Sequence, residues 1–178
     1  MLLRASTLFI ACLFSYASFS QGPQRIVLIR HGEKPETGDN LSCQGLNRAM
    51  ELSTVLYKKI GVPDQIYVPA LHTGKKTSIA RMYQTITPFA VKYNLGINSK
   101  FQEEDYAGIA ADIRERTGTV LLVWEHKAIG KIVAALGVKD KAKWEAEDFD
   151  SIWIITYANG VAKLSVDKEN IKPSPGCQ

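Results

Sequence analysis

Apolar side chains follow two different periods along the chain. Runs that are continuously apolar or that alternate predict β-strands at residues 25–29, 65–68, 119–124, 151–157 and 161–166. The runs at 25–29 and 119–124 lack alternation, which is typical of strands buried on both faces of a parallel sheet. Asn159-Gly160 separates the last two strands and predicts a tight antiparallel hairpin.

Between the strands, apolar residues recur every three or four positions, which is the spacing of one helix face. This pattern predicts helices over residues 42–60, 78–93, 105–116 and 128–136. Ser42 is the expected N-cap of the first helix, and Leu46 and Met50 are expected on its buried face. Pro88 lies inside the second helix and predicts a kink or a break there.

Strands that alternate with helices along residues 21–178 indicate βαβ units, because parallel strands need a crossover connection. We therefore expect one α/β domain with three αβα layers. Its mostly parallel central sheet would carry helices on both faces and an antiparallel C-terminal edge hairpin. In such a sheet, functional groups gather at the carboxyl ends of the strands.

Residues 1–20 have the layout of a secretory signal peptide. One early cation, Arg4, precedes an apolar stretch without acidic residues, and cleavage is expected after Ser20. Serines interrupt the stretch, which is shorter than the roughly 20 apolar residues of a membrane span. We therefore expect export to the periplasm or the extracellular space, and no stable membrane insertion after cleavage.

Two cysteines, Cys43 and Cys177, follow this segment. In an oxidising compartment they would form a disulfide that ties the C-terminal tail to the start of the first helix; the alternative is a pair of free thiols. The formal net charge of +4 at pH 7 is a mild excess, and no basic run is interleaved with aromatic residues. This composition argues against nucleic acid as a partner and is compatible with an anionic small substrate.

Two histidines follow the two continuously apolar strands. His31 comes directly after Arg30 at the end of the first strand, and His126 follows the strand over 119–124. Parallel strands would deliver both imidazoles to the same sheet edge. Arg30 supplies a planar set of donors that matches a phosphate, and Gly32 permits close approach of the backbone to a ligand. These residues predict an anion site at that edge.

Four segments together resemble the signatures of the histidine phosphatase superfamily, whose fold is shared with cofactor-dependent phosphoglycerate mutases. They are Arg-His-Gly-Glu at 30–33, Leu-Ser-Cys-Gln-Gly-Leu-Asn-Arg-Ala at 41–49, Arg-Met-Tyr-Gln-Thr at 81–85, and Val-Leu-Leu-Val at 120–123 leading to His126. They occur in the family's order and span most of residues 25–136. The stretches at 124–127 and 148–151 are most similar to an exported bacterial subgroup of this superfamily.

The resemblance implies hydrolysis of a phosphomonoester through a phosphohistidine on His31. Arg30, Arg81 and His126 would surround the transferring phosphoryl group and neutralise its charge. The implied reaction needs no metal and no other cofactor, and the three histidines of the chain have no metal-ligand spacing. We expect a phosphoric monoester hydrolase of the histidine acid phosphatase type.

Two sets of carboxylates are candidates for the proton donor to the leaving group. Glu125 is the first candidate, because it directly precedes His126, where most members of the family carry glycine. Strand alternation would point these two side chains in opposite directions, but a strand end can break that alternation. The second set is Glu103, Glu104 and Asp105, which follow the second-arginine helix. The alternative roles are an ion pair for Glu125 and a solvated helix start for the second set.

The short loop at 34–40 and the lack of a cap domain predict an open site. Such a site suits a phosphate carried by a small molecule, a glycan or a peptide. It argues against mutase activity, since an isomerase must retain its intermediate while the substrate reorients. The competing class is a protein that binds phosphate or a phosphorylated ligand without turnover. A pure binder has no need of a nucleophile, so His31 argues for the enzyme.

Overall fold

The computed structural model describes residues 22–23, 25–74 and 79–177, and in this part of the chain strands and helices alternate as predicted. The strands are β1 (Arg25–Arg30), β2 (Gln65–Tyr67), β3 (Thr119–Trp124), β4 (Ser151–Ala158) and β5 (Val161–Lys168). The helices are α1 (Cys43–Ile60), α2 (Ala80–Tyr93), α3 (Tyr106–Arg114) and α4 (His126–Ala135). The expected signal peptide, residues 1–20, lies outside the described residues.

The five strands form one sheet in the order β2-β3-β1-β4-β5. β1 pairs in parallel with β3, and β3 pairs in parallel with β2. β4 pairs antiparallel with β1 and with β5. The predicted mostly parallel sheet with an antiparallel C-terminal edge hairpin is therefore confirmed. β1 is the central strand, and its carboxyl end lies beside that of β3.

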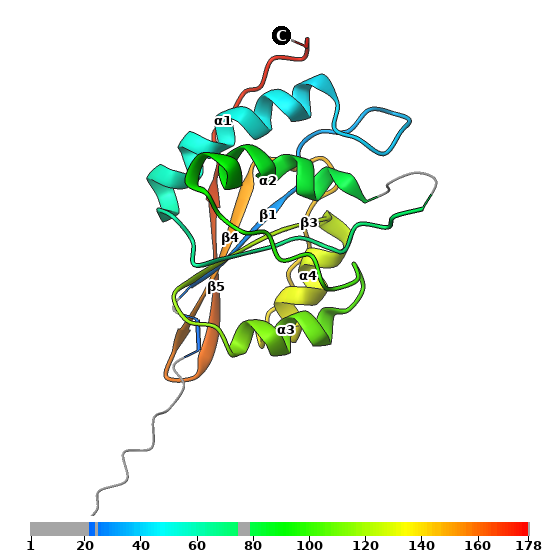
Figure 1. The fold of residues 1–178 in the computed structure, drawn as a ribbon. Coiled ribbons are helices and arrows are strands. Elements are labelled where there is room, and N and C mark those ends of the chain that lie inside the picture. Colours follow the sequence, from blue (N-terminus) through cyan, green and yellow to red (C-terminus); the bar gives the residue numbers. More distant parts are fainter. Residues whose placement is uncertain (1–21, 24, 75–78, 178) are drawn as a thin grey trace, which may run out of the picture.

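Helices cover both faces of the sheet, which gives the three predicted layers (Figure 1). α1 and α2 lie over one face, and α3 and α4 lie over the other. Successive side chains of β1 alternate between the two cores: Val27 and Ile29 pack with α1 and α2, whereas Ile26 and Leu28 pack with α3 and α4. All four side chains are fully buried, which accounts for the uninterrupted apolar run.

α1 begins at the predicted N-cap, where the Ser42 hydroxyl accepts a hydrogen bond from the Gly45 amide, but its buried face differs from the prediction. Leu46 and Met50 are 49% and 61% exposed, and the residues packed under the helix include Ala49, Leu52 and Leu56. At 3.6 residues per turn, Leu46 and Met50 lie on a stripe beside that buried one. Leu46 and Met50 are therefore apolar residues at the surface of α1 and are not part of the core.

The prediction at Pro88 was a kink or a break, and the break is wrong, because α2 continues through this residue. Proline removes one helical hydrogen bond, but Ile86 and Phe89 on either side of it are fully buried, and packing holds the helix together there. The first described residue of α2 is Ala80, and the predicted start at Ser78 lies outside the described residues. α4 starts at His126, two residues before the predicted position.

The C-terminal elements agree with their sequence signals. Asn159 and Gly160 have φ values of 51° and 74°, as the tight turn of a two-residue hairpin requires. Cys43 and Cys177 form the predicted disulfide, with their Cα atoms 4.7 Å apart. The Asn47 amide also donates hydrogen bonds to carbonyls of the tail. The tail is therefore held on the first turn of α1. None of the described helices is long and apolar enough to cross a membrane.

Candidate active site

The carboxyl ends of β1 and β3 bring the two predicted histidines to one edge of the sheet. Arg30 and Trp124 are partners in the parallel register, and the His31 amide donates a hydrogen bond of 3.1 Å to the Trp124 carbonyl. His31 directly follows β1, which ends at Arg30, and His126 lies two residues after Trp124, the last residue of β3. The predicted delivery of both imidazoles to one sheet edge is therefore observed.

His31 is a buried imidazole with one committed nitrogen. His31 is only 3% exposed, and its Nδ1 lies 2.7 Å from the Gly32 carbonyl oxygen. A carbonyl only accepts, so the proton of the neutral ring is on Nδ1 and the lone pair is on Nε2. Burial, together with the charges of Arg30, Arg81 and His126, lowers the pKa of His31 to about 4. The ring is therefore neutral at pH 7.

Arg30 is oriented by a loop that is distant in the sequence. Its Nη1 donates to the carbonyls of Ala146 and Asp148, and its guanidinium carbon lies 3.8 Å from the centre of the Phe149 ring. The same ring meets His31 edge-on, with the ring centres 6.1 Å apart. Burial lowers the pKa of Arg30. Phe149 is thus a flat apolar support under both residues, as a cation-π contact allows.

The loop between α4 and β4 is itself fixed by hydrogen bonds. The Asp148 carboxylate accepts from the amides of Asp150 and Ser151, at 2.9 and 3.0 Å. The Trp144 indole donates to the Asp148 carbonyl at 2.7 Å and packs against Trp153 of β4. Residues 144–151 therefore form a stable platform for Arg30. The run Asp-Phe-Asp-Ser at 148–151 was visible in the sequence, but its contact with Arg30 was not.

Thr85 connects α2 to the histidine segment. The Thr85 hydroxyl accepts a hydrogen bond of 2.9 Å from the Gly32 amide and donates one of 2.8 Å to the Arg81 carbonyl. Thr85 is fully buried. The guanidinium of Arg81, one turn earlier on α2, donates to the Gly38 carbonyl at 3.2 Å. Thr85 thus links the backbone of Arg81 to the backbone of Gly32, and so fixes the position of Arg81 relative to His31.

Three polar atoms of this cluster are buried and have no hydrogen-bond partner among the described residues: Arg30 Nε, Arg81 Nε and His126 Nδ1. Burial lowers the pKa of His126, and the charge of Arg30 lowers it further. A guanidinium Nε–H is a donor only, so two of these atoms offer unpaired donors. Buried donors of this kind are costly unless an acceptor reaches them. The arrangement suits an anion with several acceptor oxygens.

Gly32 serves a different contact from the predicted one. A Cβ at Gly32 would lie 2.8 Å from the Gly45 carbonyl oxygen, and a Cβ at Gly45 would lie 2.2 Å from the Glu33 carbonyl oxygen. Both distances are far shorter than real contacts allow. The expectation that Gly32 admits a ligand is therefore replaced by a close packing of two backbone segments, the end of β1 and the start of α1.

Glu33 belongs to a buried ion network that supports the histidine segment. The Arg48 guanidinium donates to both Glu33 carboxylate oxygens and, through Nη1, to Glu169 at 2.6 Å. One arginine cannot neutralise two carboxylates. Glu33 accepts from both Nε and Nη2 of Arg48, whereas Glu169 accepts from Nη1 alone. Burial accordingly raises the pKa of Glu169 to about 8, despite its contact with Arg48. The pKa of Arg48 is raised, since Glu33 and Glu169 both favour its charged form.

Two of the candidate proton donors lie close enough to influence each other. Glu103 has a raised pKa, chiefly through burial and also through the charge of Glu125, while Arg81 opposes the shift. The charge of Glu125 also acts on Arg30. Asp105 instead caps α3, where its carboxylate accepts from the Gly108 amide at 2.9 Å. The structure therefore brings Glu103 and Glu125 to the arginines and gives Asp105 a structural role.

In the described ranges 22–23, 25–74 and 79–177, no group of three or more His, Cys, Asp or Glu side chains is arranged to hold a metal ion. The third histidine, His72, is exposed and its Nε2 contacts the Gln102 amide oxygen at 3.0 Å. The groups that gather at the sheet edge are therefore two imidazoles, two guanidinium groups and two carboxylates.

Several solved structures have the same fold. The protein histidine phosphatase SixA, complexed with tungstate, superposes with a TM-score of 0.61 at 16% identity, over 82% of this chain and 97% of that one. A phosphoserine phosphatase from Entamoeba histolytica gives 0.57 at 13% identity, over 82% and 96%. A phosphoglycerate mutase from Bacillus anthracis gives 0.51 at 14% identity, over 82% and 93%. No protein-family model and no curated protein sequence matches the chain.

These similarities establish the fold. The chain has the architecture that histidine phosphatases and phosphoglycerate mutases share, and the resemblance found in the four sequence segments is confirmed at that level. Identities of 13–16% leave the reaction and the substrate to be argued from this chain's own residues.

Proposed function

We propose that the protein hydrolyses phosphomonoesters without a metal ion, through a phosphohistidine on His31. The observation that carries the proposal is the state of the His31 ring. It is neutral, its proton is committed to the Gly32 carbonyl through Nδ1, and its Nε2 lone pair is available for attack. A nucleophile that stays unprotonated at pH 7 beside three cationic or potentially cationic groups matches phosphoryl transfer.

The reaction divides into two displacements. First, the Nε2 lone pair attacks phosphorus, the bond from phosphorus to the ester oxygen breaks, and a carboxylic acid gives its proton to the departing oxygen. Then a water molecule attacks the phosphohistidine while the resulting carboxylate takes its proton. The phosphorus–nitrogen bond breaks, inorganic phosphate leaves, and the acid and the neutral imidazole are both restored.

Arg30, Arg81 and His126 are proposed to bind the phosphoryl oxygens in both steps. Arg30 and Arg81 have buried Nε donors without a partner among the described residues, so they can donate to an oxyanion without breaking a bond seen at that atom. Phe149 and the carbonyls of residues 146 and 148 hold Arg30 in place before the substrate arrives. Such preorganisation is a major source of rate enhancement, because little reorientation accompanies the reaction.

The Glu103 and Glu125 carboxylates are proposed to act as a pair in proton transfer. Glu125 was the first candidate from the sequence, and Glu103 is the member whose pKa is raised. When two carboxylates interact, one holds a proton more tightly than an isolated group does. We therefore assign the donated proton to Glu103 and the charge that helps retain it to Glu125.

The proteins of similar architecture include a protein histidine phosphatase and a phosphoserine phosphatase, and also a phosphoglycerate mutase. For this chain, the open site expected from the short loop at 34–40 favours hydrolysis over isomerisation. For this chain the physiological substrate is proposed to be a phosphorylated compound outside the cytoplasm. Export rests on the signal-peptide layout of residues 1–20 and is consistent with the Cys43–Cys177 disulfide. The competing function is phosphate binding without turnover.

Hydrolysis of p-nitrophenyl phosphate in the presence of EDTA tests the proposal. We expect turnover by the native chain and its loss on His31→Ala substitution, with the fold checked by circular dichroism. Lys58→Ala, an exposed cation in the last turn of α1, controls for an alanine substitution away from the site and should retain activity. Brief mixing with labelled substrate should also leave acid-labile, alkali-stable label on the native chain. Tight phosphate binding with no turnover would instead support the binding protein.

A further inference from the structure

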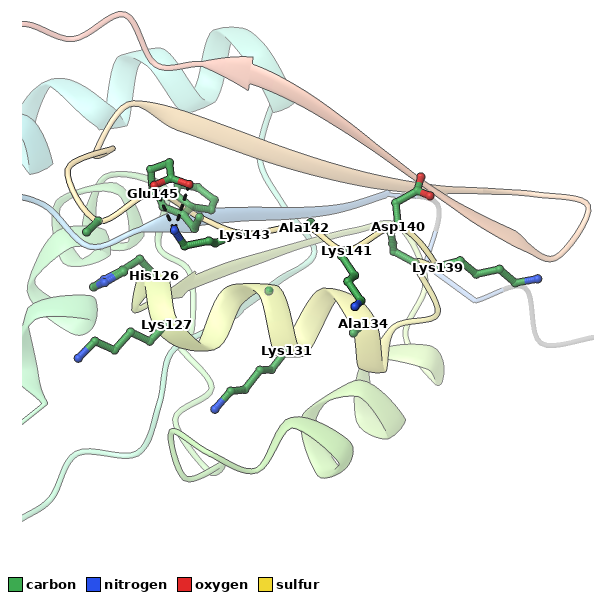
Figure 2. A pocket seen from close by; sticks show the side chains of 14 residues that line it. His126, Lys127, Lys131, Ala134, Lys139, Asp140, Lys141, Ala142, Lys143 and Glu145 are labelled. Carbon is green, nitrogen blue, oxygen red and sulfur yellow. Dashed lines mark hydrogen bonds and ion pairs between the residues drawn. The ribbon is translucent and has the colours of Figure 1, made fainter.

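A groove of about 660 Å³ runs along α4 and leads away from His126 (Figure 2). One wall is the exposed side of α4, and the other is the segment that connects α4 to β4. His126 lies at one end, and Lys139 and Asp140 lie at the far end. Since α4 has ten residues, the groove follows roughly 15 Å of helix. It is therefore longer than a single phosphate or a monosaccharide needs.

The side chains around this groove are strongly basic. Five exposed lysines contribute to its lining: Lys127, Lys131, Lys139, Lys141 and Lys143. The acidic residues in the lining are Asp140 and Glu145, and Glu145 is paired with a lysine at 3.4 Å. Positive charge is therefore concentrated in the groove, because the net charge of the whole chain is only +4. Its charge matches an occupant with several negative groups.

The connecting segment presents these charges with a regular spacing. From residue 141 to 145, Lys141, Lys143 and Glu145 are exposed, Ala142 is half-buried and Trp144 is buried. The same alternation of exposed and buried positions is typical of an extended segment, in which alternate side chains lie on one side at intervals of roughly 6.5–7 Å. An extended peptide lying alongside has the same interval between its own alternate side chains. The spacing favours a peptide over a glycan.

The two walls of the groove are held tightly together. A Cβ at Gly130 of α4 would lie 2.6 Å from the Ala142 carbonyl oxygen, so the connecting segment packs directly on the helix backbone. Trp144, buried against Trp153, anchors the same segment. A few residues later, this segment supplies the carbonyls that bind Arg30. The groove and the phosphoryl site therefore share one rigid element.

We propose that the groove binds an acidic phosphopeptide in an extended conformation, with its phosphorylated residue at His31 and its acidic residues beside the lysines. The proposal rests on the proposed phosphatase function and adds the class of substrate. The lysines contribute affinity and speed of encounter, while Arg30, Arg81 and His126 carry the reaction. A small phosphomonoester that ends near His126 gains nothing from Lys131 or Lys141.

The test compares three phosphopeptides of one length, in which the residues flanking the phosphorylated position are glutamate, glutamine or lysine. At low salt we expect kcat/KM for the glutamate peptide to exceed that for the glutamine peptide by about fivefold or more, mostly through a lower KM. The expected factor is modest because each exposed ion pair contributes little. The lysine peptide should be the poorest substrate. Raising the salt concentration should remove the difference.

The matched variants are Lys131→Gln with Lys141→Gln in the groove, and Lys163→Gln with Lys172→Gln, two exposed positions outside its lining. Both pairs remove the same charge. The groove variant should lose the preference for glutamate and keep native turnover of p-nitrophenyl phosphate, whereas the control keeps both. A preference that survives in the groove variant, or is lost equally in the control, overturns the proposal. So does a lysine-dependent preference for a phosphorylated anionic glycan over the glutamate peptide.

Binding of an acidic peptide without phosphate separates this proposal from the phosphatase function. Fluorescence anisotropy should detect weaker binding of a labelled glutamate peptide to the groove variant than to the native chain and the control. If p-nitrophenyl phosphate is not hydrolysed but this difference is present, the phosphatase function fails and the peptide groove stands. If turnover is present and the three proteins bind the peptide equally, the peptide groove fails alone.

Discussion

Glu103 and Glu125 influence each other but act on different arginines: the charge of Arg81 acts on Glu103, and the charge of Glu125 acts on Arg30. Burial raises the pKa of Glu103, and the charge of Glu125 raises it further. Sequence order pointed to Glu125, because it is adjacent to His126, while Glu103 is separated from both histidines by more than twenty residues. The raised pKa of Glu103 therefore belongs to a side chain that only the fold brings to the site.

Replacement of Glu103 by glutamine should slow the release of poor leaving groups selectively. We expect kcat for an alkyl phosphate to fall by roughly 10²-fold or more, because an alkoxide cannot leave without a proton. The formation of phosphohistidine from p-nitrophenyl phosphate should change little, since p-nitrophenolate is stable as an anion. Single-turnover rates with the two substrates measure this split.

Glu115→Gln is the matched control for this experiment, because it removes an exposed carboxylate at the end of α3 and should leave both rates unchanged. If Glu125→Gln produces the split between substrates and Glu103→Gln does not, the proton belongs to Glu125. An equal loss with both substrates would give Glu103 a structural role and exclude it as the acid.

Among the elements, the contact between the end of β1 and the start of α1 has the least tolerance. Gly32 and Gly45 bring two backbone segments together, and the Ser42 hydroxyl caps α1 on the same side. The Ser42 amide also donates to the Glu33 carbonyl at 2.9 Å. Helix α1 therefore positions the histidine segment through backbone contacts and not through its side chains alone.

Gly45→Ala should damage both stability and activity. The added Cβ would lie 2.2 Å from the Glu33 carbonyl oxygen, and backbone on both sides leaves no flexible group to move aside. We expect a loss of about 1–3 kcal/mol in the free energy of unfolding, measured by urea denaturation, together with reduced kcat.

Gly96→Ala is the control for this substitution, because a Cβ there meets no atom within 4 Å. Its unfolding midpoint should stay close to that of the native chain. A Gly45→Ala variant as stable and as active as Gly96→Ala would show that the two segments can separate without cost.

The local elements were largely predictable, because each carries its own period, cap or turn signal. Ser42, the Asn159-Gly160 turn and the apolar run of β1 agree with the structure. The misplaced features depend on distant packing: the orientation of α1 on the sheet exposes Met50, and buried neighbours keep α2 continuous at Pro88. A short stretch of sequence shows neither how a helix is oriented on the sheet nor which distant residues pack against it.

The site was predictable in part for the same reason. Short motifs predicted a site at Arg30, His31, Arg81 and His126, and the parallel pairing of β1 with β3 does bring the two histidine segments together. Phe149 could not be assigned a role, because its partner Arg30 is 119 positions earlier. Such long-range partners become visible only when the sheet order is known.

For the whole molecule, the Cys43–Cys177 disulfide closes a loop that spans a sequence separation of 134 and includes most of the domain. Such a link restricts the unfolded chain strongly. Removing both thiols with Cys43→Ser and Cys177→Ser should lower the free energy of unfolding by about 2–5 kcal/mol. The folded variant should keep its activity, since the disulfide lies outside the proposed phosphate site.

Thermal unfolding with and without reductant checks this prediction. The native chain should lose stability in reductant, and the double serine variant should not respond to it. If reductant leaves the native chain unchanged, the disulfide does not contribute to its stability in solution.

The central position of β1 also determines when the site can form during synthesis. β1 and His31 are translated early, yet the strands on either side of β1 are β3 and β4, and the loop that orients Arg30 precedes β4 directly. A nascent chain that ends before residue 146 therefore contains His31 but lacks the two carbonyls and the Phe149 ring that hold Arg30. On the proposed function, phosphatase activity is therefore expected only from chains that include roughly the last fifth of the sequence, and shorter fragments should be inactive.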